Sequence, residues 1–141
     1  MACAYATGRV RLAWPYHAQT PELCVRDGST FVFLPAGGQF EPDTLAAVKI
    51  DDAPVAEFST AAAKDLLWIV HQKGLTFTEP QPDPGVDRAA YDDWETRMKH
   101  FYETPVDLTE QLPTAHTVTI ELPLYDNGRQ QVTFNVAGLK P

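Results

Sequence analysis

The C-terminal segment from Thr117 to Leu139 constrains the fold of this chain more than any other. It contains two alternating apolar runs on either side of Asp126-Asn127-Gly128, a combination that strongly favours a β-hairpin. In each run the residues of one parity are apolar, namely Val118, Ile120, Leu122 and Leu124 in the first and Val132, Phe134 and Val136 in the second. The segment therefore predicts an antiparallel hairpin with one buried face.

The two apolar faces also predict the loop of this hairpin. A two-residue loop of Asn127 and Gly128 would set Leu122 opposite Thr133 and point the two apolar faces to opposite sides of the sheet. A three-residue loop, Asp126-Asn127-Gly128, instead sets Leu122 opposite Val132, Ile120 opposite Phe134, and Val118 opposite Val136. We therefore predict a type I turn with Gly128 in the left-handed conformation, forming a G1 bulge.

Upstream of the hairpin, short apolar runs alternate with turn-forming residues. The chain has 141 residues, with 12 prolines and eight glycines, a length that suits one domain over residues 1–141. Runs separated by about ten to fifteen residues are typical of a β-meander or sandwich. The expected strands are Val10–Trp14, Glu22–Arg26, Thr30–Leu34, Leu45–Ile50, Pro54–Phe58 and Leu66–Val70.

Residues 79–104 interrupt this β pattern. A proline-rich linker, Glu79–Gly85, leads into Val86–Tyr102, where apolar residues recur at the spacing of an amphipathic helix. Its apolar stripe is Ala90, Trp94, Met98 and Phe101. A short helix is expected next, with Thr104 as its N-cap, Pro105 at the first helical position and Asp107 three residues after the cap. Its apolar face consists of Val106, Leu108 and Leu112, and the helix ends at Pro113.

These patterns together predict an α+β chain. We expect an antiparallel β-sandwich-like domain of about seven strands. The acidic amphipathic helix of residues 79–104 is inserted in it, and the β-hairpin is C-terminal.

Negative charge is concentrated in the helical insert. The formal net charge of the chain is −8, and residues 79–110 contain nine acidic and three basic side chains. Nucleic acid is disfavoured as a direct ligand because its binding requires a basic surface. A basic protein partner would fit this charge distribution.

No group of residues in the sequence predicts catalysis, a metal site or a cofactor. The four histidines are scattered without metal-ligand spacing, and no nucleophile elbow or phosphate-binding loop is present. Asp51-Asp52 and Asp92-Asp93 are carboxylate pairs, but sequence neighbours on a strand or helix point in different directions. We therefore expect a protein that is not an enzyme.

The two cysteines, Cys3 and Cys24, leave the compartment open. If they are paired, they close a loop of about twenty residues and stabilise the fold by roughly 3 kcal/mol. If they are free, they are buried thiols. Arg9 and Arg11 lie where a signal peptide would have its apolar core, and no apolar run approaches the ~20 residues of a membrane span. The alternatives are a cytoplasmic protein, or a periplasmic or secreted one whose leader has been removed.

Two groups of aromatic residues are candidates for partner contacts. Trp14 and Tyr16 surround Pro15 near the first expected strand, where they form either the edge of the core or a contact site. In the insert, Tyr91 and Tyr102 would point outward among the carboxylates. The predicted partner-binding residues are Tyr91, Asp92, Asp93, Trp94, Glu95, Tyr102, Trp14 and Tyr16.

The order of segments resembles the TagO-like exported β-proteins associated with type VI secretion. The residues that carry this resemblance are Pro21–Arg26 running into Asp27–Phe33, Val48–Asp52 as a strand ending in Asp-Asp, Val106–Leu112 as a strand, and Phe134–Leu139. The segment from Glu79 to Tyr102 lies outside it. The resemblance implies a β-sandwich-like fold and a non-enzymatic role, and it assigns no catalytic residues.

The sequence thus predicts a non-catalytic protein-binding or accessory module that acts through an acidic, aromatic helical face. The alternative is an acidic inhibitor, such as a bacterial or phage immunity or counter-defence protein. Such an inhibitor would block a basic groove on a partner enzyme or on a nucleic-acid-binding complex.

Overall fold

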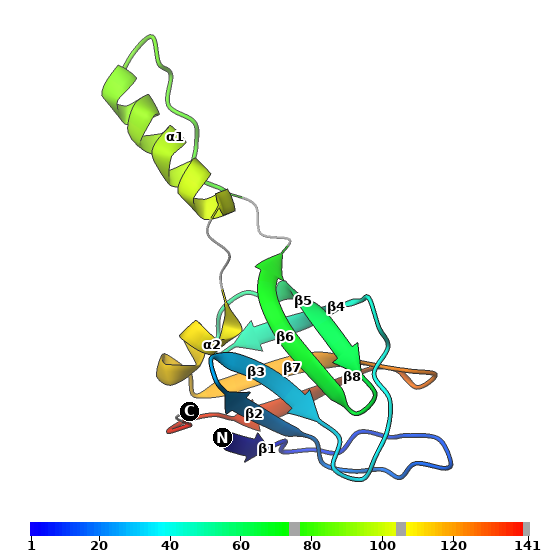
Figure 1. Cartoon of the computed structure of the whole chain (residues 1–141). Helices are drawn as coiled ribbons and strands as arrows, with labels where there is room; N and C mark the ends of the chain where they lie inside the picture. Colours follow the sequence, from blue (N-terminus) through cyan, green and yellow to red (C-terminus); the bar gives the residue numbers. More distant parts are fainter. Residues whose placement is uncertain (74–76, 104–106, 140–141) are drawn as a thin grey trace.

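The computed structural model describes residues 1–73, 77–103 and 107–139, and in them the chain is mostly antiparallel sheet (Figure 1). The described strands are β1 (Ala2–Tyr5), β2 (Glu22–Arg26), β3 (Ser29–Phe33), β4 (Leu45–Ile50), β5 (Ala56–Ala63), β6 (Leu66–Lys73), β7 (Thr117–Leu124) and β8 (Gly128–Asn135). The described helices are α1 (Arg88–Glu103) and α2 (Leu108–Gln111), with a 3-10 turn, Leu112–Thr114, directly after α2. This composition confirms the α+β class.

The strands form one sheet in the order β1-β2-β3-β6-β5-β4-β7-β8. The consecutive strands β4, β5 and β6 form a meander, and the chain then returns through α1 and α2 to place β7 beside β4. Three hairpin-connected strands followed by a long return beside the first of them form a Greek key. The long return of this Greek key contains both helices.

The sheet curls until its first and last strands meet, so the fold is barrel-like and the predicted sandwich is wrong. Ala6 forms a bridge to Phe134, and the Thr7 amide donates to the Thr133 carbonyl at 2.8 Å. Further along this seam, the Gln130 side chain accepts from the Arg11 amide and donates to the Arg11 carbonyl, both at 2.7 Å. A side chain here replaces the missing backbone ladder. Alternating strands bury one face equally well in a sandwich or a barrel, so periodicity did not distinguish the two.

The inward-facing side chains form a single core. The residues of this core with no more than 1% exposure include Val10, Leu23, Val32, Leu34, Phe40, Ala46, Val48, Phe58, Leu67, Val118, Ile120, Leu122, Leu124, Phe134 and Val136. Leu108 of α2 and Leu112 after it are also buried in this cluster, and the Thr109 hydroxyl lies 2.7 Å from that of Thr30 on β3. The short helix α2 therefore contributes to the barrel core.

The C-terminal hairpin is confirmed, but its register differs from the prediction. Ile120 pairs with Val132, Val118 with Phe134, and Leu124 with Gly128. The loop has three residues as predicted, but these are residues 125–127. Gly128 has the predicted positive φ of 69°.

The type I turn predicted for this loop is also wrong. Asp126 has a φ of 58° at the third position of a turn closed by the Asn127 amide and the Leu124 carbonyl. A type I turn requires a negative φ at that position. Residues of even number still oppose residues of even number, so the same apolar face is buried as in the predicted register.

In the N-terminal part of the chain, one predicted strand is wrong and one observed strand was not predicted. The expected strand Val10–Trp14 is reduced to one bridge between Val10 and Gln19, because the backbone of residues 11 and 13 bonds to side chains of the hairpin instead. The strand β1 was not predicted, since its sequence, Ala-Cys-Ala-Tyr, has little of the β-branched character that marks a strand.

Both predicted helices are present with altered ends. α1 begins and ends within two residues of the predicted range. The N-cap of α2 is Asp107, whose Oδ1 accepts from the Thr109 amide at 3.1 Å, so Asp107 is not the third residue after the cap. The predicted cap at Thr104, with Pro105 and Val106, lies outside the described residues.

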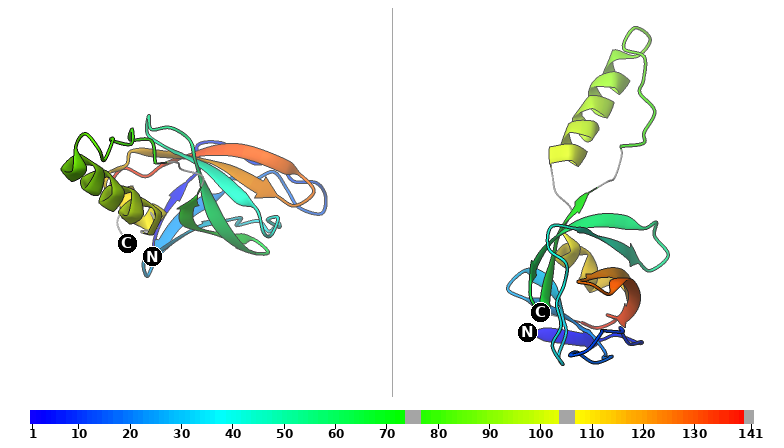
Figure 2. Two further views of the ribbon diagram at one scale, coloured as in Figure 1. Left: turned by 90° about the horizontal axis from the view of Figure 1, so that it is seen from above. Right: turned by 90° about the vertical axis from the view of Figure 1, so that its right-hand side faces the viewer.

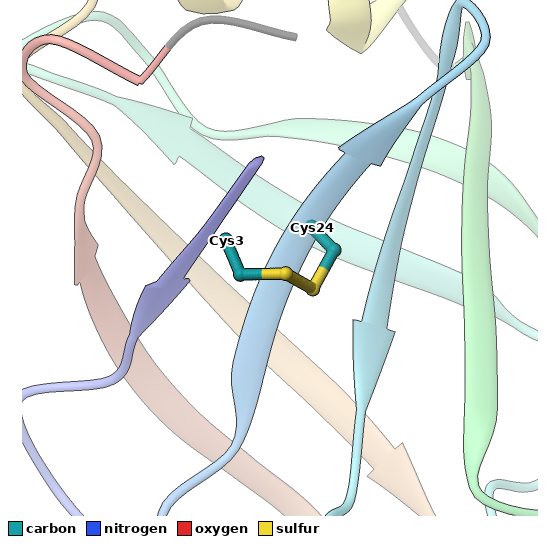
Figure 3. Close-up of a disulfide and its surroundings, with 2 residues drawn as sticks. All are labelled: Cys3 and Cys24. Atoms are coloured by element: carbon teal, nitrogen blue, oxygen red, sulfur yellow. A yellow bond between two sulfur atoms is a disulfide. The ribbon is translucent and has the colours of Figure 1, made fainter. Parts of the chain in front are cut away.

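The cysteines are paired. Cys3 on β1 and Cys24 on β2 are directly opposite each other in the ladder and form a disulfide across 21 positions of sequence (Figure 3). This bond ties β1, the strand at the seam of the barrel, to the rest of the sheet.

The helix α1 stands away from the barrel. Figures 1 and 2 show it rising from the end of β6 as a projection, with the green segment before it running alongside. No residue of α1 is buried. The predicted apolar stripe of this helix is therefore not buried against the sheet.

Candidate functional site

The described residues 77–103 form one projecting unit, which we call the arm. Its turn is built by Asp83, whose Oδ1 accepts from the Gly85 amide at 2.8 Å and whose carbonyl accepts from the amides of Val86 and Asp87. The Asp87 carboxylate then accepts from the Ala90 amide at 3.0 Å, which satisfies one of the free amides at the start of α1. The proline-rich linker and the cap together reverse the chain direction and start the helix.

One side of α1 is covered by the segment that precedes it. The Phe77 ring lies 6.1 Å from the Trp94 ring and 5.7 Å from the Phe101 ring. The Trp94 indole donates to the Glu79 carbonyl at 3.1 Å, and Arg97 pairs with the Glu79 carboxylate. Trp94, a predicted partner-binding residue, is thus partly used to hold the arm together.

The three predicted acidic residues of α1 each have a basic neighbour one helical turn away. Asp92 lies 3.2 Å from Arg88, Asp93 lies 2.9 Å from Arg97, and Glu95 lies 3.1 Å from Lys99. Exposed pairs of this kind contribute a few tenths of a kcal/mol and are screened by salt.

The arm nevertheless remains strongly negative. It contains seven acidic and three basic side chains, a net charge of −4. The field around the arm therefore favours a positively charged surface.

Two tyrosines and a methionine of α1 form a row beside the covered side. Tyr91 and Met98 are half-buried, and Tyr102 is 60% exposed. Seven and four residues separate them, which places all three on one face of a helix. The Tyr91 ring lies 5.7 Å from that of Trp94 and equally far from the Arg88 guanidinium. We call Tyr91, Met98 and Tyr102 the arm row.

The other predicted contact residues, Trp14 and Tyr16, lie at the opposite end of the barrel from the arm. Trp14 is 90% exposed and Tyr16 is 38% exposed. The Ala13 amide donates to the Asn127 side chain, which joins this loop to the tip of the C-terminal hairpin. The eight residues of β7 lead from the arm end to this tip, a distance of about 26 Å at 3.3 Å per residue. The predicted residues therefore form two separate surfaces.

Neither carboxylate pair forms a metal site among the residues that the structure describes. Asp51 Oδ1 accepts from the amides of His116 and Thr117, both at 2.9 Å, and these bonds, with that from Thr117 the stronger, lower the pKa of its carboxyl. In the described ranges, the one cluster of metal-binding side-chain types is Cys3, Glu22 and Cys24. Both sulfur atoms of this cluster belong to the disulfide and are not available as thiolate ligands.

Sequence reasoning missed an apolar surface on the outside of the barrel. Side chains on β3, β5 and β6 that alternate with the core residues are themselves apolar, namely Phe31, Phe33, Ala61, Ala63, Leu66 and Trp68. We call this set the outer apolar face. Its signal was present in the continuous apolar runs 31–34 and 66–70, which are typical of strands covered on both sides.

Comparison of the chain with models of protein families, with curated proteins and with solved structures found no match. No described helix is both long enough and apolar enough to cross a membrane. The functional argument therefore depends on the geometry of the arm and the barrel.

Proposed function

We propose that this protein is a non-catalytic protein-binding or accessory module and that the arm is its contact element. The observation that carries this proposal is that α1 projects from the barrel with none of its residues buried. An isolated helix of about this length is marginal in water, and most helical stability in proteins comes from packing. A partner that covers the arm would supply the missing burial.

The chemistry of the arm favours a basic partner. Its net charge is −4, and the exposed carboxylates of Asp92 and Asp93 lie on the same helix as the arm row. Charge complementarity accelerates association and selects the partner, while aromatic side chains supply the contact area. Trp14 and Tyr16 are too far from the arm to belong to the same contact, so we assign them to a second, smaller contact surface.

The proposal includes an oxidising compartment. Disulfides persist in periplasmic, secreted and other extracytoplasmic proteins and are rare in the cytosol. The Cys3–Cys24 bond therefore supports the periplasmic or secreted alternative, which is also the location that a TagO-like exported accessory protein would have.

The second candidate function is an acidic inhibitor. It is favoured by the shape of the arm, which is one helix and one returning segment wide (Figure 2). A narrow negative projection of about 24 Å, the length of a 16-residue helix, suits insertion into a basic groove on an enzyme or on a nucleic-acid-binding complex.

Charge reversal on the arm tests the proposed function. The variant Asp92→Lys with Asp93→Lys should lose capture of the partner, which is identified by mass spectrometry after affinity purification at low and at moderate salt. The matched control, Glu41→Lys with Asp52→Lys, makes the same charge change at exposed barrel positions and should retain capture. Unchanged capture by the arm variant would refute the acidic-face proposal.

The kinetics of the captured pair separate the two candidates. An inhibitor should bind one basic protein tightly, with an association rate that falls steeply as salt rises. An accessory module should bind more weakly and leave the activity of its partner intact.

A further inference from the structure

The loop that follows β1 differs in charge from the rest of the molecule. Residues 7–19, which we call the Trp14 loop, contain Arg9 and Arg11 and no acidic residue, although the net charge of the chain is −8. Both arginines are exposed, and so are two aromatic residues of the loop, Trp14 and Tyr16. The surface of this loop therefore combines positive charge with aromatic rings.

The two arginines of the loop are available to an anionic ligand. Every other arginine of the chain forms an ion pair with a carboxylate, namely Arg26, Arg88, Arg97 and Arg129. Within the ranges that the structure describes, Arg9 and Arg11 have no such pair. A guanidinium presents its N–H donors in a planar fork that fits the oxygens of a phosphate. A phosphate group is therefore a ligand that suits this loop.

Trp14 is held outward on a fixed turn. The Tyr16 amide donates to the Ala13 carbonyl at 3.0 Å, which closes the turn around Trp14 and Pro15. The Ala13 amide donates to the Asn127 side chain at 2.9 Å and so fixes the turn to the C-terminal hairpin. Trp14 is nevertheless 90% exposed. The turn therefore presents the indole ring without enclosing it.

The aromatic rings lie further out than the arginines. Val10 and Gln19 exchange backbone hydrogen bonds of 2.8 and 3.1 Å at the base of the loop, and Arg9 and Arg11 flank Val10 there. Trp14 lies midway between the two bonded residues, at the far point of the loop. A ring in front and guanidinium groups behind it follow the order of a bilayer surface, where apolar chains lie beneath the phosphates.

Two loops bond to the Trp14 loop and add little charge. The C-terminal hairpin loop contains one carboxylate, Asp126. Residues 35–40, which bond to the Gln19 side chain, are uncharged. Glu41, the next acidic residue, bonds through its backbone to β7. The two arginines therefore outnumber the one carboxylate of the adjoining loops.

The acidic arm lies at the opposite end of the molecule. Figure 1 shows the blue Trp14 loop running out past the strands at one end of the barrel and the arm rising at the other. The length of β7 alone separates these ends by about 26 Å, whereas the Debye length is about 10 Å at 0.1 M salt. An anionic surface at the Trp14 loop is therefore screened from the net charge of −4 on the arm.

We propose that the Trp14 loop binds the surface of an anionic lipid bilayer. Trp14 and Tyr16 enter the interfacial layer, where amphipathic aromatic rings are favoured. Arg9 and Arg11 bind the phosphates of the headgroups. The barrel remains outside the bilayer, and the arm points away from it.

The shape of the loop favours a bilayer over a small ligand. Small-ligand sites are concave and enclose most of the ligand, whereas the Trp14 ring has little protein beside it. A bilayer surrounds an inserted ring without needing a pocket on the protein. Two aromatic rings and two arginines supply apolar insertion together with electrostatic attraction, the two contributions on which reversible attachment depends.

This inference rests on the second contact surface of the proposed function, whose partner it names, and it does not involve the arm. Changes in the Trp14 loop should leave capture of a basic protein by the arm intact. Loss of vesicle binding with intact capture would refute this inference alone. Absence of capture with intact vesicle binding would refute the role of the arm alone.

Flotation of the full chain with lipid vesicles tests the proposal. The chain should float with vesicles of phosphatidylcholine and phosphatidylglycerol, less so as salt rises. Its affinity for phosphatidylcholine alone should be about thirtyfold lower, the loss expected for two basic residues at an anionic surface. Arg9→Gln with Arg11→Gln should cause the same loss. The matched control, Lys49→Gln with Lys73→Gln, removes equal charge at exposed positions and should retain the affinity.

The aromatic contribution is tested by a second pair of variants. Trp14→Ser should lower the affinity for the anionic vesicles at least about tenfold, because a buried indole contributes a large apolar area. Val55→Ser makes an apolar-to-polar change at another exposed position and should retain the affinity. Circular dichroism checks that each variant is folded.

Fluorescence quenching shows which part of the protein enters the bilayer. Lipids with brominated acyl chains should quench the fluorescence of the bound chain, and this quenching should disappear in Trp14→Phe. Quenching that persists in that variant would place another tryptophan in the bilayer and overturn the proposal.

The flotation results can overturn the proposal in three ways. The chain does not float, it floats equally with and without phosphatidylglycerol, or either loop variant floats like the unaltered chain. If the chain instead associates with a second copy and the arginine variant loses that association, the arginines bind an acidic protein surface and not lipid.

Discussion

The barrel and the arm are stabilised by opposite kinds of contact. The barrel buries a continuous core from the described strands β2 to β8 and from α2, and its seam joins residues more than 100 positions apart. The arm buries none of the residues of α1, and its bonds join residues within about 25 positions of one another. The difference indicates that the barrel carries the stability of the protein, which leaves the arm free for the contacts that we propose for it.

The largest expected effect on stability comes from removing a phenylalanine side chain, which can be compared between the barrel and the arm. Phe134 is fully buried in the barrel and Phe101 is half-buried in the arm. Phe134→Ala should lower the free energy of unfolding by about 4 kcal/mol because it leaves a cavity in the core. Phe101→Ala should lower it by no more than about 0.5 kcal/mol. Urea denaturation monitored by circular dichroism measures the free energy of unfolding of both variants. Equal losses of stability would contradict the division of roles between barrel and arm.

The disulfide provides the next largest effect. Replacing both Cys3 and Cys24 with serine should destabilise the barrel by about 3 kcal/mol in the chain-entropy model, for a closed loop of this size. The amide exchange rates of α1 should stay the same, since the bond lies in β1 and β2. Faster exchange in α1 would show that the arm depends on the seam.

A smaller effect is expected where a side chain closes the barrel. Gln130→Ala removes both hydrogen bonds to the backbone of Arg11 and should cost about 1 to 2 kcal/mol. Gln131→Ala, its exposed neighbour on the outer surface of β8, is the control and should change stability by less than about 0.5 kcal/mol. If the two variants have the same denaturation midpoint, Gln130 does not close the seam.

The smallest effect concerns the acid stability of the barrel. The pKa of Asp51 is lowered in the folded state by the amides of Thr117 and His116. The contribution of the Asp51 carboxylate to folding stability is therefore fully present above its pKa in the unfolded state. This contribution is lost as the pH falls through its pKa in the folded state. Asp51→Asn should flatten the decline of stability on the acid side and leave the arm unaffected. Thermal unfolding at a series of acid pH values measures this. If the stability of Asp51→Asn fell more steeply with decreasing pH than that of the unaltered chain, the role assigned to Asp51 would be wrong.

The sequence predicted local features of the fold well. The C-terminal hairpin, the buried parity of its strands, the left-handed Gly128 and the helix of residues 86–102 follow from neighbouring residues alone. The exact register did not, because the Tyr125 amide bonds to the carbonyl of Gln39 and the Asn127 side chain bonds to residue 13. Contacts of that sequence separation leave no local pattern.

The candidate site shows the same limit. The acidic and aromatic residues of α1 could be found from charge and spacing, but helical periodicity predicts an apolar stripe without saying what packs on it. The separation of Trp14 and Tyr16 from the arm follows from strand order, which short runs do not encode. The outer apolar face could have been recognised from the consecutive apolar residues of β3 and β6.

Native-state hydrogen exchange tests the central claim most directly. The account predicts that amides of β7 exchange only through global unfolding, and that Phe134→Ala lowers their protection by its full effect on stability. Amides of α1 should exchange through much smaller openings that Phe134→Ala does not change. Equal protection of α1 and β7, lost together in the variant, would contradict the claim that the arm is held apart from the barrel as a contact element.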